Sequence, residues 1–314
     1  MISKDRCIEV VEYAIANGEE ACLVAYSIPR DTYTRYLREY KKHFGENAEL
    51  LMALKKRFTA EELSALVKGQ SIVERGHRSP TVSFDCTEVT FGIMSDTHIG
   101  SIFTHEDYIQ QALEEMEKGG CEFLVHAGDS VEGMMNRPNA IYKLNHIGYK
   151  AQRDATVDIF KHWTKPLYIV GGNHNASFDV KFGVGMDITE GICSRLPDAT
   201  YLGSLDGKFD LNGVPVMVFH GNDGAAVALS YREQRLVDTM APSDLPGILI
   251  TGHVHKAFYC FYRGVHIICG GTLQSQTPFM RGKKLPAHVG WWKVKAGIQD
   301  GKVRWIEPRW YSYE

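Results

Sequence analysis

The chain has 314 residues, of which 44% are hydrophobic and 23% are charged, and its formal net charge is −3. These values are typical of a globular protein with a large core, and they exclude binding to nucleic acid through an overall basic charge. The seven cysteines show no CxxC spacing, which favours reduced thiols in a cytoplasmic protein, in the host cytoplasm if the chain is phage-encoded. No apolar segment approaches the roughly 20 residues that span a bilayer, so we expect no membrane contact.

Residues 1–70 are predicted to form a small all-α domain. Apolar residues recur there at helical spacing in CIEVVEYAIANG, EEACLVAYS and TYTRYLREYKKHFG, and strand-like alternation is absent. The segment YSIPRDTYTRYLREYKK (26–42) resembles the second half of a helix-turn-helix motif.

The second helix of such a motif enters the major groove of DNA with its N-terminal residues on the base edges. The residues predicted to contact DNA are Arg30, Thr32, Arg35 and Arg38. Helix-turn-helix shapes also occur as plain packing units, so an oligomerisation or partner-docking domain is an equal alternative. The oligomeric state is left open.

Residues 71–85 are predicted to be a linker, because they are polar and interrupted by Gly and Pro. Residues 86–314 read as an α/β domain. Short apolar runs in VTFGIMSD, CEFLVHAGD, PLYIVGGNH, VPVMVFHGND and GILITGHVH alternate with helix-compatible stretches such as HEDYIQQALEEMEKGG. The final stretch, VGWWKVKAGIQDGKVRWIEPRW, predicts two antiparallel strands joined at Asp-Gly.

Five of these apolar runs are followed by side chains of metal-ligand type. They are Asp96, His98, Asp129, Asn173, His220, His253 and His255. Strand ends along one edge of an α/β sheet converge in space. A single histidine after a strand is more often structural, but five successive strands ending this way by chance is improbable. Carboxylates, imidazoles and one amide suit Mn, Fe, Zn or Ni better than Ca or Mg.

The ordered set D-x-H, G-D, G-N-H, H-G and G-H-x-H over about residues 88–280 resembles the calcineurin-like metallophosphoesterase family. The resemblance implies two facing mixed β-sheets flanked by helices, and two divalent transition-metal ions, with Mn expected first and Fe, Zn or Ni as alternatives. By resemblance the ligands divide between one ion (Asp96, His98 and His255), the other ion (Asn173, His220 and His253) and a bridge (Asp129). His174 is expected to protonate the leaving oxygen or stabilise the transition state.

The implied reaction is hydrolysis of a phosphate ester by in-line attack of a hydroxide that bridges the two ions. The segment 270–294 resembles the small, exonuclease-bearing subunit of archaeal family D DNA polymerase and phage-type DNA repair phosphoesterases. We therefore expect a DNA phosphodiesterase or nuclease. The alternative is a phosphatase, or a phosphodiesterase acting on cyclic nucleotides or other small molecules. Gln274, Gln276 and Arg281 are equally compatible with phosphate contacts and with structural hydrogen bonds.

Four further residues carry expectations. Asn175 stands where many members of the family carry an acidic residue, which would weaken metal binding or change the partner of His174. Glu132 either supports a ligand or starts a helix. His126 and His105 are expected to be structural.

Overall fold

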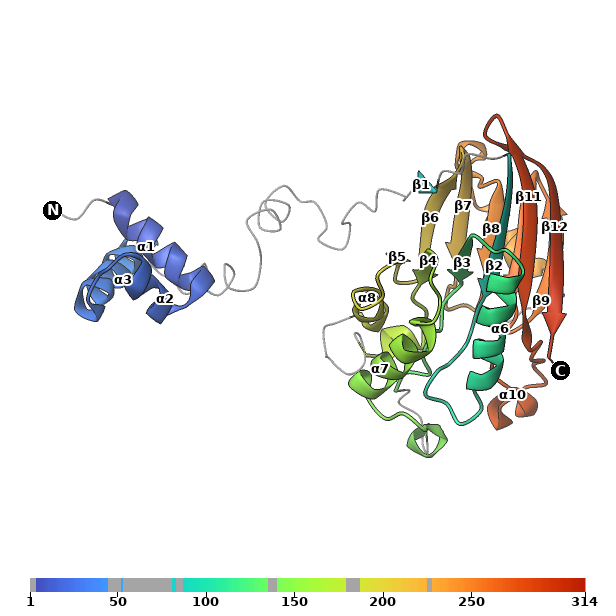
Figure 1. Cartoon of the computed structure of the whole chain (residues 1–314), viewed down its shortest axis with the longest axis horizontal. Coiled ribbons are helices and arrows are strands. Elements are labelled where there is room, and N and C mark those ends of the chain that lie inside the picture. The colour runs from blue at the N-terminus through green and yellow to red at the C-terminus, as the bar shows by residue number, and fades with distance from the viewer. Residues whose placement is uncertain are drawn as a thin grey trace. The chain divides into compact units, whose positions relative to one another are not determined.

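The computed structural model describes residues 4–44, 52, 81–82, 87–134, 140–178, 187–224 and 228–313. Its contacts divide the chain into two units, residues 1–76 and 77–314 (Figure 1), and each is described by itself. The segment predicted as a linker, 71–85, lies outside the described residues except for Thr81 and Val82. Among the described residues, no helix combines the length and the apolar character needed to cross a membrane.

The N-terminal unit is helical. Its described helices are α1 (Lys4–Asn17), α2 (Glu19–Ala25) and α3 (Arg30–Phe44). Val10 of α1, Cys22 of α2 and Tyr33 of α3 are buried in one apolar cluster, so the helices enclose a small core as their periodicity predicts. Of the remaining residues predicted to be helical, 45–70, only Met52 is described.

The C-terminal unit contains two six-stranded sheets. The first has the order β1 (Thr81–Val82), β6 (Asp206–Leu211), β7 (Val214–Phe219), β8 (Ile248–Thr251), β10 (Val265–Gly270) and β9 (Ala257–Tyr262). The second has the order β12 (Lys302–Ser312), β11 (Gly290–Gln299), β2 (Glu88–Met94), β3 (Phe123–His126), β4 (Leu167–Val170) and β5 (Ala199–Gly203). Strands β2 to β5 run parallel, as do β7, β8 and β10, whereas β9 and β11 pair antiparallel with their neighbours. Both sheets are therefore mixed, as predicted.

Helices flank the sheets. They are α6 (Glu106–Lys118), η2 (Ala140–Lys143), α7 (Tyr149–Phe160), η3 (Asn175–Ser177), α8 (Ile188–Cys193), α9 (Tyr231–Asp238), η4 (Pro242–Asp244) and α10 (Pro278–Gly282). The central strands are buried on both faces. In β3, Phe123 and Val125 join the cluster between the sheets, whereas Leu124 packs with Met116 of α6 on the outer face. Helices α6, α7 and α8 lie on the outer side of the second sheet (Figure 1).

The C-terminal hairpin is confirmed. Strands β11 and β12 pair antiparallel up to Gln299 and Lys302. Asp300 and Gly301 connect them with φ values of 53° and 65°, the left-handed pair that a two-residue hairpin turn requires. Near the N-terminal end of this unit's sequence, Thr81 and Val82 of β1 pair with β6, which places two residues of the predicted linker in a sheet.

Candidate metal centre

Seven predicted side chains come together at the carboxyl ends of five strands. Asp96 and His98 follow β2, Asp129 follows β3, Asn173 follows β4, His220 follows β7, and His253 and His255 follow β8. Backbone bonds tie neighbouring loops, because the amides of Asp96, His98 and Asp129 donate to the carbonyls of Gly128, Asp129 and Gly171 at 2.9, 3.0 and 3.0 Å. The two sheets thus contribute to one site.

One half of the site is formed by Asp96, His98 and His255. Nε2 of His255 lies 3.3 Å from Oδ1 of Asp96 and 3.1 Å from Nε2 of His98. All three residues are at most 9% exposed, and their ligand atoms lie close enough together to hold a metal ion. These three residues are the ones that the family resemblance assigns to one ion.

The other half is formed by Asn173, His220 and His253. Nδ1 of His253 lies 2.8 Å from Oδ1 of Asn173, and Nε2 of His220 lies 3.0 Å from Oδ2 of Asp129. The same Asp129 oxygen is 4.0 Å from Nε2 of His98 in the first half. Asp129 therefore lies between the two groups, where a bridging carboxylate belongs.

The backbone at the site is strained. Asp96, His98, Asp129, His253 and His255 have φ values of 50°, 47°, 50°, 79° and 54°. Residues with a Cβ adopt this left-handed region at a cost of about 1–3 kcal/mol each, and such strain concentrates at functional sites. Five of the seven candidate ligands share it, so the fold holds them in place against local preference.

Hydrogen bonds fix which ring nitrogens can bind a metal. Nδ1 of His220 donates to the Ala127 carbonyl at 2.7 Å, and Nε2 of His253 donates to the Asp223 carbonyl at 2.5 Å. A carbonyl only accepts, so these nitrogens carry protons, and in the neutral ring the opposite nitrogens hold the lone pairs that a metal ion binds. Those opposite nitrogens, Nε2 of His220 and Nδ1 of His253, face Asp129 and Asn173.

The donor set fits a cation. Among the described residues, the buried Nε2 of His220 has no hydrogen-bond partner, although a carboxylate oxygen of Asp129 lies 3.0 Å away. A lone pair facing a carboxylate is repulsive unless a proton or a metal ion lies between them. Burial opposes a charge on His220, but the neighbouring carboxylates of Asp129 and Asp96 outweigh it and raise the pKa of the ring.

The pKa values of both site carboxyls are lowered. Burial disfavours the charge of Asp96, yet His255 and His220 hold the pKa of its carboxyl well below the usual value. The pKa of Asp129 is likewise lowered, because His220 and His174 outweigh the effect of burial. The site therefore offers buried anionic oxygens beside imidazole nitrogens, a combination that transition-metal ions prefer.

Glu132 lies outside any helix and supports the site. Its Oε2 lies 3.0 Å from Nδ1 of His98 and accepts a hydrogen bond from Nε2 of Gln274 at 3.1 Å. Its backbone carbonyl accepts a hydrogen bond of 2.7 Å from Nδ1 of His174. His174 is thus oriented by a carbonyl rather than by a carboxylate, and burial lowers its pKa. A ring nitrogen of His174 also lies within 4.8 Å of possible metal-binding atoms of His98 and Asp129.

Arg232 on α9 is a supporting residue that the sequence reasoning missed. Its guanidinium donates to the carbonyls of His220 and Gly252 and to Oδ1 of Asp223, and it pairs with Glu233 at 3.0 Å. These contacts hold the two loops that carry His220 and His253. No local motif marks Arg232, because all of its loop contacts are distant in the sequence.

The other singled-out residues have structural contacts. Asn175 is buried and its Nδ2 donates to Ser130 and Thr189 at 2.9 and 2.8 Å, so the amide links neighbouring loops. Nε2 of His126 lies 3.1 Å from Thr97 Oγ1, and burial lowers the pKa of His126 to about 3.

The segment after β10 is tied to the fold as well. Nε2 of His105 lies 2.6 Å from Ser275 Oγ, and Nε2 of Gln276 donates to the Leu285 carbonyl at 2.7 Å. Together with the Gln274 contact to Glu132, these bonds give both glutamines structural roles. Arg281 is exposed on α10.

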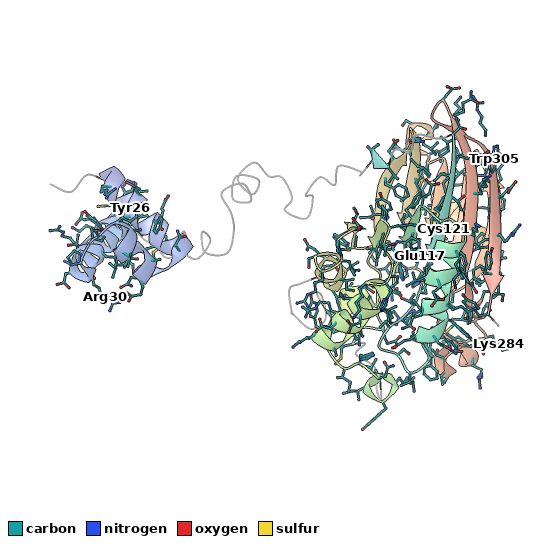
Figure 2. The ribbon with its side chains drawn as sticks, viewed as in Figure 1. Tyr26, Arg30, Glu117, Cys121, Lys284 and Trp305 are labelled. Atoms are coloured by element: carbon teal, nitrogen blue, oxygen red, sulfur yellow. The ribbon has the colours of Figure 1, made fainter. Side chains whose placement is uncertain are left out.

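The predicted DNA contacts belong to the other unit. Arg30 opens α3 (Figure 2) and pairs with Glu20 and, at 3.0 Å, with Glu19. Thr32 is half-buried, whereas Arg35 and Arg38 are exposed. Exposed ion pairs are weak, so the contacts of Arg30 leave its DNA role a prediction.

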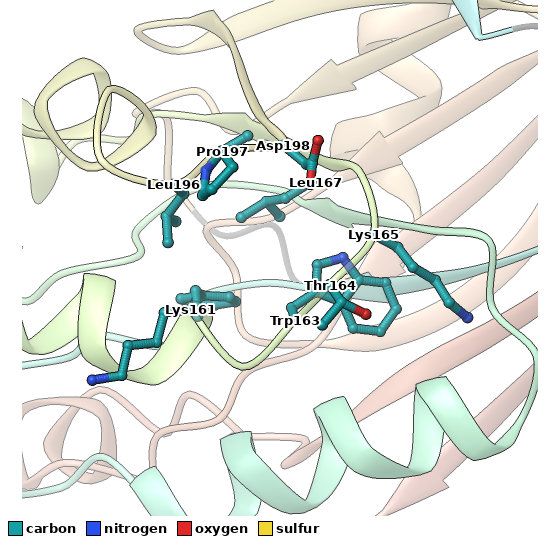
Figure 3. Close-up of a pocket in the computed structure, with 10 residues that line it drawn as sticks. Lys161, Trp163, Thr164, Lys165, Leu167, Leu196, Pro197 and Asp198 are labelled. Carbon is teal, nitrogen blue, oxygen red and sulfur yellow. The ribbon is translucent and has the colours of Figure 1, made fainter.

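Two cavities differ in their chemistry. A cavity of about 450 Å³ opens onto the metal-type side chains, including Asp129, His174 and His253. Another cavity of about 240 Å³ (Figure 3) is lined by Trp163, Lys165 and other residues near the beginning of β4. That place is the opposite end of the strand from Asn173, so only the first cavity coincides with the candidate site.

Comparison with known proteins gives the class. A family model described as the calcineurin-like phosphoesterase superfamily domain matches residues 89–282. The chain belongs to this superfamily, as its motifs predict, and it is a metal-dependent phosphoesterase, an enzyme that hydrolyses phosphate ester bonds.

Particular relatives are more distant. The DNA polymerase II small subunits of Methanothermobacter thermautotrophicus and Archaeoglobus fulgidus are each 26% identical to it, over 62% and 76% of this chain. These alignments cover 50% and 58% of the two subunits, so the chain spans about half the length of these relatives. A solved archaeal phosphodiesterase shares 15% identity, with a TM-score of 0.43 over 71% of this chain and all of that one.

Proposed function

We propose that this chain hydrolyses phosphodiester bonds of DNA at a centre of two divalent transition-metal ions, with Mn as the expected metal. The observation that carries the proposal is the convergence of seven metal-type side chains, five of them with left-handed backbone. One ion would lie with Asp96, His98 and His255. The other would lie with Asn173, His220 and His253, and Asp129 would touch both.

When bound, the two ions supply an activated water and positive charge for the phosphate. The chain's own residues position the catalytic groups and protonate the leaving oxygen. The Glu132 carbonyl holds the Nδ1 proton of His174, which leaves Nε2 as the ring nitrogen that can exchange a proton with the substrate. Burial disfavours the imidazolium in the free protein, and a phosphate dianion or diester beside the ring favours it. His174 thereby acts as the acid for the leaving oxygen.

DNA is proposed as the substrate because both curated relatives are subunits of a DNA polymerase. In this proposal residues 1–70 form a separate helical domain, 71–85 a linker and 86–314 the catalytic domain. The helical domain would bind DNA through α3, with Arg35 and Arg38 exposed for phosphate contacts.

An activity panel in Mn²⁺ tests the proposal. It compares bis-p-nitrophenyl phosphate, p-nitrophenyl phosphate, cyclic nucleotides, and single- and double-stranded DNA. We expect cleavage of the diester and of DNA, and loss of both in Asp129→Asn. Hydrolysis of monoesters or cyclic nucleotides without cleavage of either DNA would overturn it in favour of a small-molecule enzyme.

A further inference from the structure

The cavity that holds the candidate metal ligands continues past them. Part of its wall is made by metal-type side chains, and another part is made by Phe103, Val254, Phe279 and Met280. At about 450 Å³, the cavity is larger than a phosphate group needs, and its lining combines this apolar wall with the polar and charged side chains of the candidate metal centre. A group attached to a phosphate at the candidate metal centre can therefore reach an apolar surface.

Helix α10 and its flanks build that surface. The amide of Met280 donates to Oγ1 of the capping Thr277 at 3.2 Å, and the buried Met280 side chain anchors the helix. The amide of Leu285 donates to the Met280 carbonyl at 2.9 Å, and Gln276 closes the segment by donating to the Leu285 carbonyl. This frame presents Phe279 at the cavity with 48% of its surface exposed.

One lysine lines the cavity, and two more follow helix α10. Lys143 of η2 lines the same cavity, and its carbonyl accepts a 2.9 Å bond from Ile102, in the loop that follows His98. Lys283 and Lys284, directly after α10, are exposed, and Lys284 lies beside that helix in Figure 2. Cations that attract phosphates next to an aromatic face are the combination that binds unpaired nucleotides.

We infer that the apolar part of this cavity is a nucleobase subsite, in which the base of an unpaired nucleotide stacks on Phe279 while its phosphodiester lies at the metal-type side chains. The inference deepens the proposed function and rests on it. A base inside a duplex is covered on both faces by its neighbours, so it cannot stack on a protein ring without leaving the helix. The subsite therefore selects single-stranded DNA or a frayed end.

Product inhibition tests the subsite in the Mn-loaded full chain. Hydrolysis of bis-p-nitrophenyl phosphate is measured with deoxyadenosine monophosphate, inorganic phosphate or phosphotyrosine added as an inhibitor. We expect the nucleotide to inhibit at a concentration roughly 5- to 150-fold below that of phosphate, the range that stacking of one base provides. In Phe279→Ala this ratio falls towards one. In the matched control Phe261→Ala, which removes an exposed ring on β9 outside the cavity, it is kept.

Equal inhibition by the nucleotide and by phosphate overturns the inference, as does an unchanged ratio in Phe279→Ala. Phosphotyrosine inhibiting as strongly as the nucleotide also overturns it, because the wall then accepts any aromatic phosphate. Cleavage of DNA is scored separately. A nucleotide preference without DNA cleavage supports the subsite and defeats the proposed nuclease, whereas cleavage of single strands and duplexes at equal rates without that preference defeats the subsite alone.

Discussion

The two units of this chain differ in what their side chains do. In the C-terminal unit, Asp96, Asp129 and His220 are buried polar groups, and among the described residues the Nε2 atom of His220 has no hydrogen-bond partner. In the N-terminal unit, Arg30 is exposed and already paired with acidic neighbours in the same unit. A buried charge costs free energy unless a partner compensates it, so its position points to a specific role. An exposed charge costs little, so its position alone does not indicate a role.

The largest expected effect is at Asp129, the proposed bridging carboxylate. Asp129→Asn keeps the shape of the side chain and its acceptance of the His174 amide, but it removes the charge shared by both ligand groups. We expect activity below detection and loss of bound Mn, measured by bis-p-nitrophenyl phosphate hydrolysis and elemental analysis. The exposed Asp244→Asn on η4 is the control. An Asp129→Asn protein that keeps its metal and its rate would contradict the bridging role.

His174→Ala sharpens the assignment of acid against ligand. We expect the metal content to stay and the rate on DNA to fall about 10²–10⁴-fold, the usual contribution of a positioned acid. Hydrolysis of bis-p-nitrophenyl phosphate should fall less, because p-nitrophenolate leaves without a proton. His146→Ala, which removes a partly exposed histidine paired with Glu106, serves as control. Loss of metal in His174→Ala would make His174 a ligand instead.

Arg232→Lys tests whether the buried network behind the site positions the ligands. Lysine keeps the charge but cannot reach the His220 and Gly252 carbonyls together with Asp223. We expect the Mn concentration for half-maximal activity to rise about 10–100-fold, as for other supports of metal ligands, with a smaller change in kcat. Arg235→Lys, on the exposed side of the same helix, is the matched control. A fall in kcat with no change in the Mn concentration for half-maximal activity would refute the positioning role.

The smallest effect is expected in the N-terminal unit. Arg35→Ala with Arg38→Ala should weaken binding of duplex DNA and reduce the slope of log affinity against log salt by about 2, since each lost phosphate contact removes about 0.9. Fluorescence anisotropy at several salt concentrations measures this slope. The double variant Lys118→Ala with Lys161→Ala, on exposed positions of the other unit, controls for net charge. Equal slopes for all three proteins would remove α3 as a DNA-binding element and favour the docking alternative.

The sequence predicts the fold, and the convergence of the candidate metal ligands, for a physical reason. Parallel strands place their carboxyl ends at one edge, so candidate ligands that are far apart in the chain, such as Asp96 and His253, converge once the strands are recognised. The hairpin turn at Asp300-Gly301 is also predictable from the sequence, because few residue pairs adopt two left-handed conformations in succession.

The supporting contacts could not be predicted in the same way. Glu132, Asn175 and Arg232 act through partners brought near by tertiary packing, and a single polar residue in the sequence carries no record of its partner. The sequence therefore left Glu132 between two interpretations and gave no sign of Arg232. Similarly, nothing in the spacing around Thr81 indicates that it extends a sheet through pairing with β6.

Anomalous diffraction from crystals of the Mn-loaded chain tests the central claim most directly. We predict two Mn peaks in the cavity, one beside His98 and His255 and one beside His220 and His253, with Asp129 in contact with both. A single peak, peaks away from these residues, or no bound Mn would contradict a two-metal centre built from the five strand ends.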